Sequence, residues 1–245
     1  MEHEFYKRMW EVQDTFWWYK GMRKFFDMFL QKYVGSHGYE ILDIGCGTGS
    51  LFPVLRRYGT VYGIDVSDEA VKYAREQGMA KEVVRGNAEA LPFSAERFDV
   101  VVCSDLLYHV QVKDDIAVLK EIHRVLKQGG VLVIKEAAYD WLRSRMDELG
   151  QTKHRFTLGE LRQKLSVAHF QVQRITYIMT ILFPLAFTAR LLEQIVPRTY
   201  DASALFRCAS IVNTLFTTIL LFEVWLLRYV NFPFGLSIIA VARKF

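Results

Sequence analysis

Short apolar runs alternate with amphipathic stretches along most of this chain, between residues 40 and 177. The apolar runs have the length of strands, and the first two end at Gly45 and Asp65. Between them, apolar residues recur at three-to-four spacing, which is typical of helices packed along one face. Because strand–helix alternation requires right-handed crossovers, the sequence predicts an α/β fold whose parallel sheet is covered by helices on both faces.

The boundaries of these elements follow from apolar runs and capping signals. The predicted strands occupy residues 40–44, 60–64, 82–86, 98–104, 131–136 and 170–177. The predicted helices occupy residues 50–57, 67–77, 113–126 and 158–166. Ser67 is a typical N-cap residue, and Thr157 with Glu160 forms the pattern of a capping box. Gly129 and Gly130 are expected to stop the helix over 113–126.

The two ends of the chain depart from this alternation. Residues 1–34 carry apolar and aromatic side chains at helical spacing and predict an N-terminal helix. Two apolar helical stretches, 178–196 and 203–230, precede a strand-like run at 234–242. If that run rejoins the sheet, the two helices form an inserted cap. The predicted divisions are a helical lid (1–38), a ligand-binding core (39–177), a helical insertion (178–233) and a final core strand (234–245).

Charge and cysteine content narrow the class of protein. The net charge is +4 and the basic residues form no long run, which disfavours a nucleic-acid binder. The three cysteines are far apart and form no CxxC pair, so we expect neither a disulfide framework nor a metal site. Residues 1–24 contain no signal-peptide core, and we expect a cytoplasmic protein. The longest charge-free run of the tail, 208–222, is shorter than the ~20 residues of a membrane span.

The apolar stretches over 178–230 favour a hydrophobic cap or a homodimer face. A second interpretation is a greasy substrate or a peripheral contact with the inner face of the membrane. In that case the basic residues of the tail would lie near lipid headgroups; they are Arg190, Arg198, Arg207 and Arg228.

A glycine-rich turn follows the first predicted strand. Asp43 lies near the end of that strand, and Gly45, Gly47 and Gly49 come after it. In an open α/β sheet, ligands bind beyond the carboxyl ends of the strands, where glycines let the backbone approach them closely. The turn alone is also compatible with an ordinary strand–helix connection. Asp65 adds specificity, because a carboxylate at the end of the second strand can accept both ribose hydroxyls of an adenosine.

Two later segments reach the same edge of the predicted sheet. Asn87 follows the third strand, and its side-chain carbonyl can accept a hydrogen bond from an adenine amino group. The apolar strand over 98–104 brings Ser104, and then His109, to that edge. The sequence therefore predicts one binding edge shared by several strand ends.

The order of these segments resembles the class I S-adenosylmethionine-dependent methyltransferases of the small-molecule type. The resemblance covers about residues 40–136. It rests on the acidic glycine turn, Asp65, the Gly-Asn-Ala-Glu-x-Leu-Pro-Phe segment, the Phe-Asp-Val-Val strand and the Leu-Lys-x-Gly-Gly turn. It implies S-adenosylmethionine as cofactor and a Rossmann-like, doubly wound sheet of about seven strands whose last strand is antiparallel. One departure is Asn87, where such enzymes usually carry Asp; an amide can still accept a hydrogen bond.

The resemblance also implies roles for individual residues. Asp43 and the glycines would contact the methionine part of the cofactor, Asp65 would hold the ribose, and Asn87 and Ala88 would face the adenine. The full set of expected cofactor-binding residues is Trp17, Tyr19, Arg23, Asp43, Gly45, Cys46, Gly47, Gly49, Asp65, Val66, Asn87, Ala88, Glu89 and Ser104.

The aromatic segment 16–23 resembles the leader of bacterial methyltransferases associated with glycan or lipid-linked sugar pathways. Aromatic faces attract a sulfonium cation, and Arg23 can pair with the cofactor carboxylate. The alternative interpretation is a helix docked on the sheet through its aromatic stripe.

Methyl transfer to an oxygen calls for a proton acceptor with a pKa near neutrality, which suits histidine. His109 is the first candidate because it lies past the fourth strand, and His154 is the second because it follows the fifth. Each is also compatible with a structural role in its loop. The expected substrate-binding residues are Tyr108, Lys153 and Arg155, although the two cations could equally belong to a solvated basic loop.

The function expected from these residues is methylation of an oxygen on a small, lipid-linked or sugar-linked acceptor, by in-line displacement from S-adenosylmethionine. One alternative is a nicotinamide-dependent oxidoreductase, which shares the glycine turn and the acid at Asp65. Another is a catalytically silent methyltransferase fold that serves as a binding protein.

Overall fold

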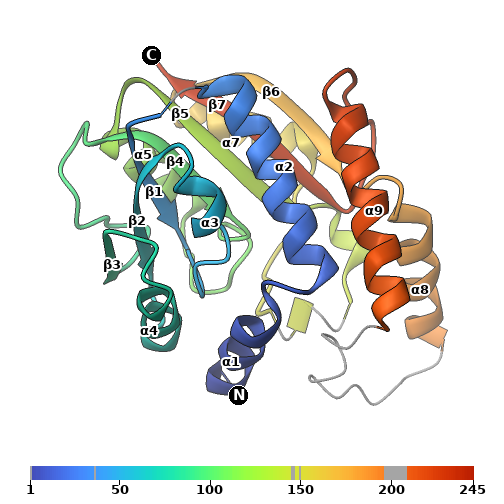
Figure 1. Cartoon of the computed structure of the whole chain (residues 1–245). Coiled ribbons are helices and arrows are strands. Elements are labelled where there is room, and N and C mark those ends of the chain that lie inside the picture. The colour runs from blue at the N-terminus through green and yellow to red at the C-terminus, as the bar shows by residue number, and fades with distance from the viewer. Residues whose placement is uncertain (1, 36, 145–146, 149, 196–208) are drawn as a thin grey trace.

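Seven strands of the described chain form one sheet in the order β3-β2-β1-β4-β5-β7-β6 (Figure 1). The computed structural model describes residues 2–35, 37–144, 147–148, 150–195 and 209–245. The strands are β1 (Tyr39–Ile44), β2 (Gly59–Asp65), β3 (Glu82–Arg85), β4 (Phe98–Ser104), β5 (Leu126–Ala137), β6 (Phe170–Ile178) and β7 (Ser237–Lys244). The pairings among β1 to β5 are parallel, whereas β7 is antiparallel to both β5 and β6. The predicted α/β fold and its antiparallel last strand are confirmed.

Helices cover both faces of the sheet, which explains why its central strands are apolar at successive positions. Along β4, Val100 and Val102 belong to one core cluster, and Val101 and Cys103 belong to the other. The helices that contribute to the first cluster are α2 (Trp17–Tyr33), α3 (Phe52–Leu55), α4 (Asp68–Glu76) and α9 (Ser210–Leu227). Those that contribute to the second are α5 (Asp115–Val125) and α7 (Leu158–Val167).

The N-terminal segment consists of two helices rather than the one that was predicted. α1 (Glu2–Val12) and α2 are separated by residues 13–16, where Phe16 has an extended backbone. α2 packs in the core, and its fully buried side chains are Phe25, Phe26, Phe29 and Leu30. α1 lies beside α4, where Trp10 stacks on Tyr73. α2 is therefore a packed layer of the domain, and the lid over residues 1–38 stays a prediction.

Two helix boundaries differ from the prediction because strand pairing decides them. α5 ends at Val125, and the buried Leu126 already pairs with Phe98 at the start of β5. Gly129 and Gly130 consequently lie within β5 instead of stopping the helix. After the glycine turn, the helix α3 is a single turn that begins only at Phe52.

The apolar tail places α8 (Phe183–Ile195) and α9 between β6 and β7 along the chain, on the flank beside α2 (Figure 1). Arg198 and Arg207 lie outside the described residues. α9 has 18 residues, a mean hydropathy of 1.7 and only 22% of its residues buried, so by length and composition alone it could cross a membrane. The charge-free run 208–222 of the sequence ends before Glu223, which α9 includes and which is fully buried in the structure.

Candidate cofactor and acceptor site

The glycine turn after β1 folds back onto β2. The N–H groups of Gly45 and Cys46 donate to the carbonyl of Ile64 at 2.8 and 3.1 Å. Gly47 and Gly49 have left-handed φ angles of 53° and 80°. At Gly49 an added Cβ would collide with the buried Phe52 ring, but at Gly47 it would meet only Met9 of α1, at 3.8 Å. The turn therefore leaves space over Gly47, where a ligand can approach the protein backbone closely.

Two buried carboxylates flank this turn. Asp65 accepts the N–H of Gly47 through Oδ2 at 2.9 Å and the N–H of Ser67 through Oδ1 at 3.0 Å. Asp43 is only 2% exposed and Asp65 only 9%. Burial raises the pKa of both carboxyl groups, and at Asp43 the charge of Asp65 raises it further. A bound cation would counter both effects, so this edge suits a positively charged ligand.

The junction between α1 and α2 is tied to the glycine turn by residues that the sequence did not single out. The buried Thr48 hydroxyl donates to Gln13 Oε1 at 2.7 Å. Arg23 donates through Nη1 to the carbonyls of Gln13 and Ser50, at 2.8 and 3.4 Å. Arg23 thus lies at the glycine turn, and Asp14 approaches it to 3.6 Å. Gln13 carries no sequence signal because its position depends on the break between two helices.

The aromatic leader divides between two surroundings. The Trp17 ring packs edge-on against Phe216 of α9 at 5.1 Å, and the backbone N–H of Trp17 donates to Asn213 Oδ1 at 2.7 Å. The Trp17 ring therefore faces the tail, and its contact with the cofactor stays a prediction. Tyr19 is buried, and burial together with Asp105 raises the pKa of its hydroxyl. Arg23, which lies at the glycine turn, is close enough for its charge to lower the pKa of Tyr19 in part.

Asn87 and Glu89 are engaged by the protein itself. Asn87 Oδ1 accepts the N–H of Glu89 at 2.9 Å, so the expected partner of an adenine amino group already closes a local turn. Glu89 Oε1 accepts the N–H groups of Asp114 and Lys113 at 2.8 and 2.6 Å, and these bonds hold the pKa of Glu89 below its ordinary value. Both residues shape the loops at this edge, and their direct contact with the cofactor stays a prediction.

The other expected cofactor residues lie near the strand ends in different states. Val66 is 41% exposed beside Asp65 and offers apolar surface. Ala88 packs on the second core cluster. The Cys46 thiol is buried, which raises its pKa. The hydroxyl of Ser104, the last residue of β4, donates to Oδ2 of the adjacent Asp105 at 3.2 Å.

A buried ion pair joins the ends of β4 and β5. Lys135 is 2% exposed, and its Nζ lies 2.7 and 2.6 Å from the two carboxylate oxygens of Asp105. Asp105 has a φ of 59°, a left-handed backbone that Asp tolerates better than most residues. The Trp18 ring lies 5.1 Å from Lys135 Nζ in a cation–π contact. Sequence reasoning missed this pair because a lysine inside an apolar run gives no sign of its burial.

Glu136 holds the loop that follows β4. It is fully buried, and its carboxylate accepts the N–H groups of Leu107 at 2.9 Å, Leu106 at 3.3 Å and Tyr108 at 3.4 Å. Burial and the neighbouring Asp105 raise the pKa of Glu136 to about 8. The next residue of this loop is His109, so Glu136 fixes the segment that presents the first candidate base.

The comparison with known families uses this same core. The model described as a methyltransferase domain matches residues 42–134, from the end of β1 into β5. The sequence is 35% identical over 116 residues to a ubiquinone biosynthesis O-methyltransferase of Actinobacillus pleuropneumoniae, covering 43% of this chain and 49% of that protein. Residues 42–134 therefore match a methyltransferase domain. Over these residues the predicted resemblance to the S-adenosylmethionine-dependent methyltransferases, and the cofactor that it implies, are supported.

Two solved structures show how far the methyltransferase fold extends. A chain in the complex of the Haloferax volcanii Trm112 methyltransferase activator has a TM-score of 0.65 at 20% identity, covering 98% of this chain and 94% of that one. An S-adenosylmethionine-dependent methyltransferase of Mesorhizobium loti has a TM-score of 0.56 at 19% identity, covering 85% and 92%. These likenesses concern the fold. The chain spans about half the length of the curated relatives it matches.

The two candidate bases of the methyltransferase domain have different surroundings. His109 is half-buried, its Nδ1 accepts the N–H of Gln111 at 3.2 Å, and its charge acts on Asp65 across the site. His154 lies between two carboxylates, with Nδ1 3.2 Å from Asp140 and Nε2 2.9 Å from Glu160. Both ring nitrogens of His154 thus contact protein carboxylates, and its role as a base stays a prediction.

The basic loop around His154 also contacts protein instead of awaiting an anionic substrate. Lys153 Nζ donates to the carboxylate of Asp115 at 2.6 Å. Arg155 is buried, and its Nε and Nη2 donate to both oxygens of Asp147 at 2.7 and 3.1 Å. A buried cation such as Arg155 needs a partner of this kind, and the substrate-binding role of both residues stays a prediction. Tyr108 stays at the edge of the site, where burial raises the pKa of its hydroxyl.

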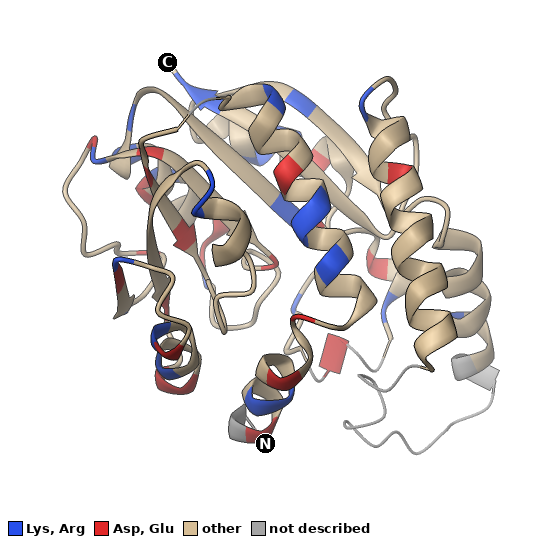
Figure 2. Ribbon diagram, in the orientation of Figure 1, with Lys and Arg blue, Asp and Glu red and all other residues tan. Residues whose placement is uncertain are grey.

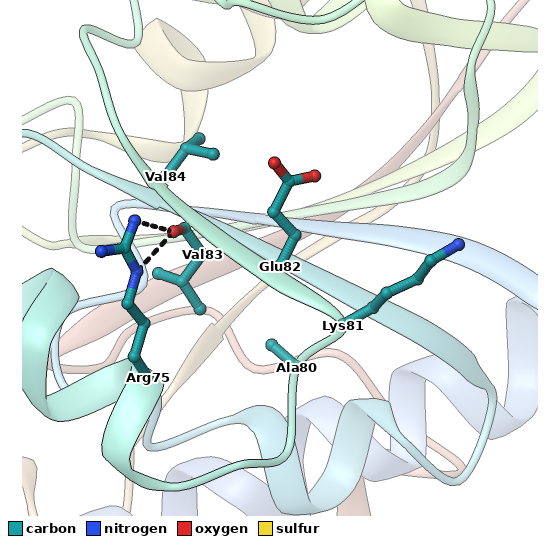
Figure 3. Close-up of a pocket in the computed structure, with 6 residues that line it drawn as sticks. All are labelled: Arg75, Ala80, Lys81, Glu82, Val83 and Val84. Carbon is teal, nitrogen blue, oxygen red and sulfur yellow. Dashed lines mark hydrogen bonds between the residues drawn. The ribbon is translucent and has the colours of Figure 1, made fainter.

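A separate pocket lies at the outer strand β3 (Figure 3). Its lining residues are Arg75, Ala80, Lys81, Glu82, Val83 and Val84. Arg75 donates through Nε and Nη2 to the carbonyl of Val83, at 2.9 and 2.7 Å, which leaves the guanidinium committed to the backbone. We assign this pocket no part in the methyltransferase site. Among the described residues, no group of three or more His, Cys, Asp or Glu side chains can hold a metal ion.

Proposed function

We propose that this chain transfers a methyl group from S-adenosylmethionine to an oxygen of a small, lipid-linked or sugar-linked acceptor. The observation that carries the proposal is the open glycine turn between the buried carboxylates Asp43 and Asp65. When bound, S-adenosylmethionine supplies a methyl group on a sulfonium that is already an activated leaving group. Asp65 would hold the ribose hydroxyls, and Asp43, the space over Gly47 and Arg23 would hold the amino-acid end.

The same geometry speaks against the nicotinamide alternative. A dinucleotide places its pyrophosphate on the N-terminus of the helix that directly follows the glycine turn. Here α3 begins only at Phe52 and is one turn long. The buried Asp43, near the end of β1, would also repel a pyrophosphate, whereas it would attract an ammonium group.

The acceptor side of the site supports an oxygen nucleophile. His109 lies on the loop held by Glu136, and its positive charge when protonated lowers the pKa of Asp65, which supports a role on the cofactor side. In the proposal His109 Nδ1, which otherwise accepts the N–H of Gln111, takes the proton of the acceptor hydroxyl, and the ring becomes an imidazolium. One of the relatives is a ubiquinone biosynthesis O-methyltransferase, which is consistent with oxygen as the methylated atom.

Calorimetry with S-adenosylhomocysteine tests the cofactor site. We expect the wild-type chain to bind it and to bind no nicotinamide dinucleotide. Asp65→Ala should lower the affinity at least about 10-fold, since one hydrogen bond to a charged group contributes about 1.5–3 kcal/mol. Asp68→Ala is the matched control, because its side chain is 74% exposed at the start of α4. Unchanged affinity in Asp65→Ala would contradict the ribose assignment.

Turnover separates an enzyme from a silent binding protein. Radiolabelled S-adenosylmethionine should transfer its methyl group to at least one hydroxylated acceptor in a panel of phenols, sugars and lipid-linked sugars. Binding of S-adenosylhomocysteine without transfer to any of them would favour the silent alternative.

A further inference from the structure

The outward face of α9 carries no charged side chain. Its exposed residues are Ser210, Ile211, Val212, Thr214, Leu215, Thr218, Leu221, Phe222 and Trp225. Ile211 is 82% exposed, and a helix of 18 residues is about 27 Å long. Helices that face water normally carry polar and charged residues on that side. The outer side of α9 is therefore uncharged and mostly apolar, which is typical of a helix face that another surface covers.

The only charge within α9 is turned inward. Glu223 is fully buried, and its carboxylate accepts the N–H groups of Thr180 and Ile181 at 3.1 and 2.9 Å. On the same side, Leu220 packs closely over Gly21 of α2. These contacts fix the rotation of α9 about its axis, so the apolar face cannot turn into the domain.

Neighbouring elements extend the apolar face and give it a basic border. In α8, Leu185, Leu191 and Leu192 are exposed. Figure 2 shows α9 almost without charge beside α2, which carries several basic positions. α2 packs against α9, and its Lys24 and Lys32 are exposed; so is Arg228 at the end of α9, next to the exposed Tyr229. The outward faces of α8 and α9 together form the α8–α9 flank.

The border indicates which partner covers the α8–α9 flank. In a two-fold dimer the same patch meets itself, which would crowd the bordering basic residues around one apolar contact. An anionic bilayer instead offers phosphates to the cations and acyl chains to the apolar face. Trp and Tyr side chains such as Trp225 and Tyr229 also suit the level between headgroups and acyl chains.

We propose that the α8–α9 flank docks onto the surface of an anionic lipid bilayer. α9 lies along the surface and does not cross it, because Leu220, Val224 and Leu227 remain packed in the core. The outward side chains enter the boundary between headgroups and acyl chains, as in other interfacial helices. This docking does not depend on methyl transfer, so either proposal can fail without the other.

Vesicle flotation of the full chain tests the docking. The wild type should float with vesicles of phosphatidylcholine and phosphatidylglycerol, and less with phosphatidylcholine alone. The double variant Leu215→Glu, Trp225→Glu should lose at least about 10-fold in vesicle affinity, because it places charge in the apolar boundary. Val167→Glu, at a half-exposed apolar position on α7, should float like the wild type. Lys24→Glu with Arg228→Glu should weaken flotation only with the anionic vesicles.

Two results would overturn the proposal. One is a wild-type chain that floats with neither kind of vesicle. The other is a stable wild-type dimer by light scattering that the Leu215→Glu, Trp225→Glu variant converts to a monomer while neither protein floats. Thermal unfolding and S-adenosylhomocysteine binding of each variant show whether its fold is intact, and the wild-type flotation decides the question if a variant does not fold.

Discussion

Four acidic side chains meet at the carboxyl edge of the sheet, and each has a different environment. Asp43 is buried beside Asp65, Asp65 accepts backbone N–H groups, Asp105 pairs with Lys135, and Glu136 anchors a loop. Of these four carboxylates, Asp105 is the one whose negative charge is balanced by a buried ammonium group, that of Lys135. An edge of this kind favours a cationic ligand and disfavours phosphates, which is a property of single residues rather than of the fold.

Glu136 gives this edge a measurable pH dependence. Its pKa rises from an ordinary 4.5 to about 8 in the folded chain, so the folded state holds this proton more tightly than the unfolded state. The contribution to the free energy of unfolding is therefore complete below 4.5 and is lost as the pH rises through about 8. Glu136→Gln should flatten this part of the urea-unfolding profile. Parallel profiles for variant and wild type would mean that the pKa of Glu136 is the same in the folded and unfolded states, which would contradict the prediction.

The two histidines provide a contrast at the same scale. His109→Gln should lower kcat by about 10²- to 10⁴-fold, the usual contribution of a positioned base, and leave S-adenosylhomocysteine affinity unchanged. His154→Gln should leave kcat near the wild-type value and cost less than about 1 kcal/mol of stability, because its ion pairs are partly exposed. Equal losses of kcat in both variants would refute the assignment of the base.

At the level of elements, close approach between α2 and α9 determines how the tail attaches. An added Cβ at Gly21 would overlap the buried Leu220, whose Cβ and Cγ would lie 3.2 and 3.3 Å away. Gly21→Ala should therefore destabilise the chain by about 1–3 kcal/mol despite the higher helix propensity of alanine.

Gly159→Ala on α7 is the matched control, because an added Cβ there meets nothing within 4 Å. It should be at least as stable as the wild type in urea unfolding. Adding Leu220→Ala to Gly21→Ala should cost less than the sum of the two single changes. Strict additivity would mean that the two helices do not press on each other at this point.

The sequence predicted the strands well because short apolar runs mark most of them, and the carboxyl ends of the parallel strands necessarily share an edge. That is why Asp43, Asp65 and the glycine turn were found without a structure. The break at residues 13–16 and the outward turn of Trp17 were not predictable, since they depend on which helix α2 packs against. Helical spacing alone does not distinguish the sheet from α9 as the neighbour of an aromatic ring.

At the scale of the whole molecule, the cofactor side of the site was easier to predict than the acceptor side. The cofactor side is built from β1, β2 and their turns, which are near one another in sequence. The acceptor side combines α2, the loop after β4 and the end of β5 through Glu136, Lys135 and Trp18. The pairing of Arg155 with Asp147 also depends on tertiary structure, so the sequence could not show that this basic loop has a protein partner.

The insertion of β7 between β5 and β6 has a consequence for biosynthesis. β6 leaves the ribosome before α8, α9 and β7, yet its only strand neighbour in the described sheet is β7. Until residues 237–244 emerge, β5 and β6 both present unpaired edges, and the apolar helices have no completed sheet to cover. The apolar helices α8 and α9 are thus synthesised before β7 completes the sheet. During that time chaperones or a nearby bilayer can bind them and compete with self-association.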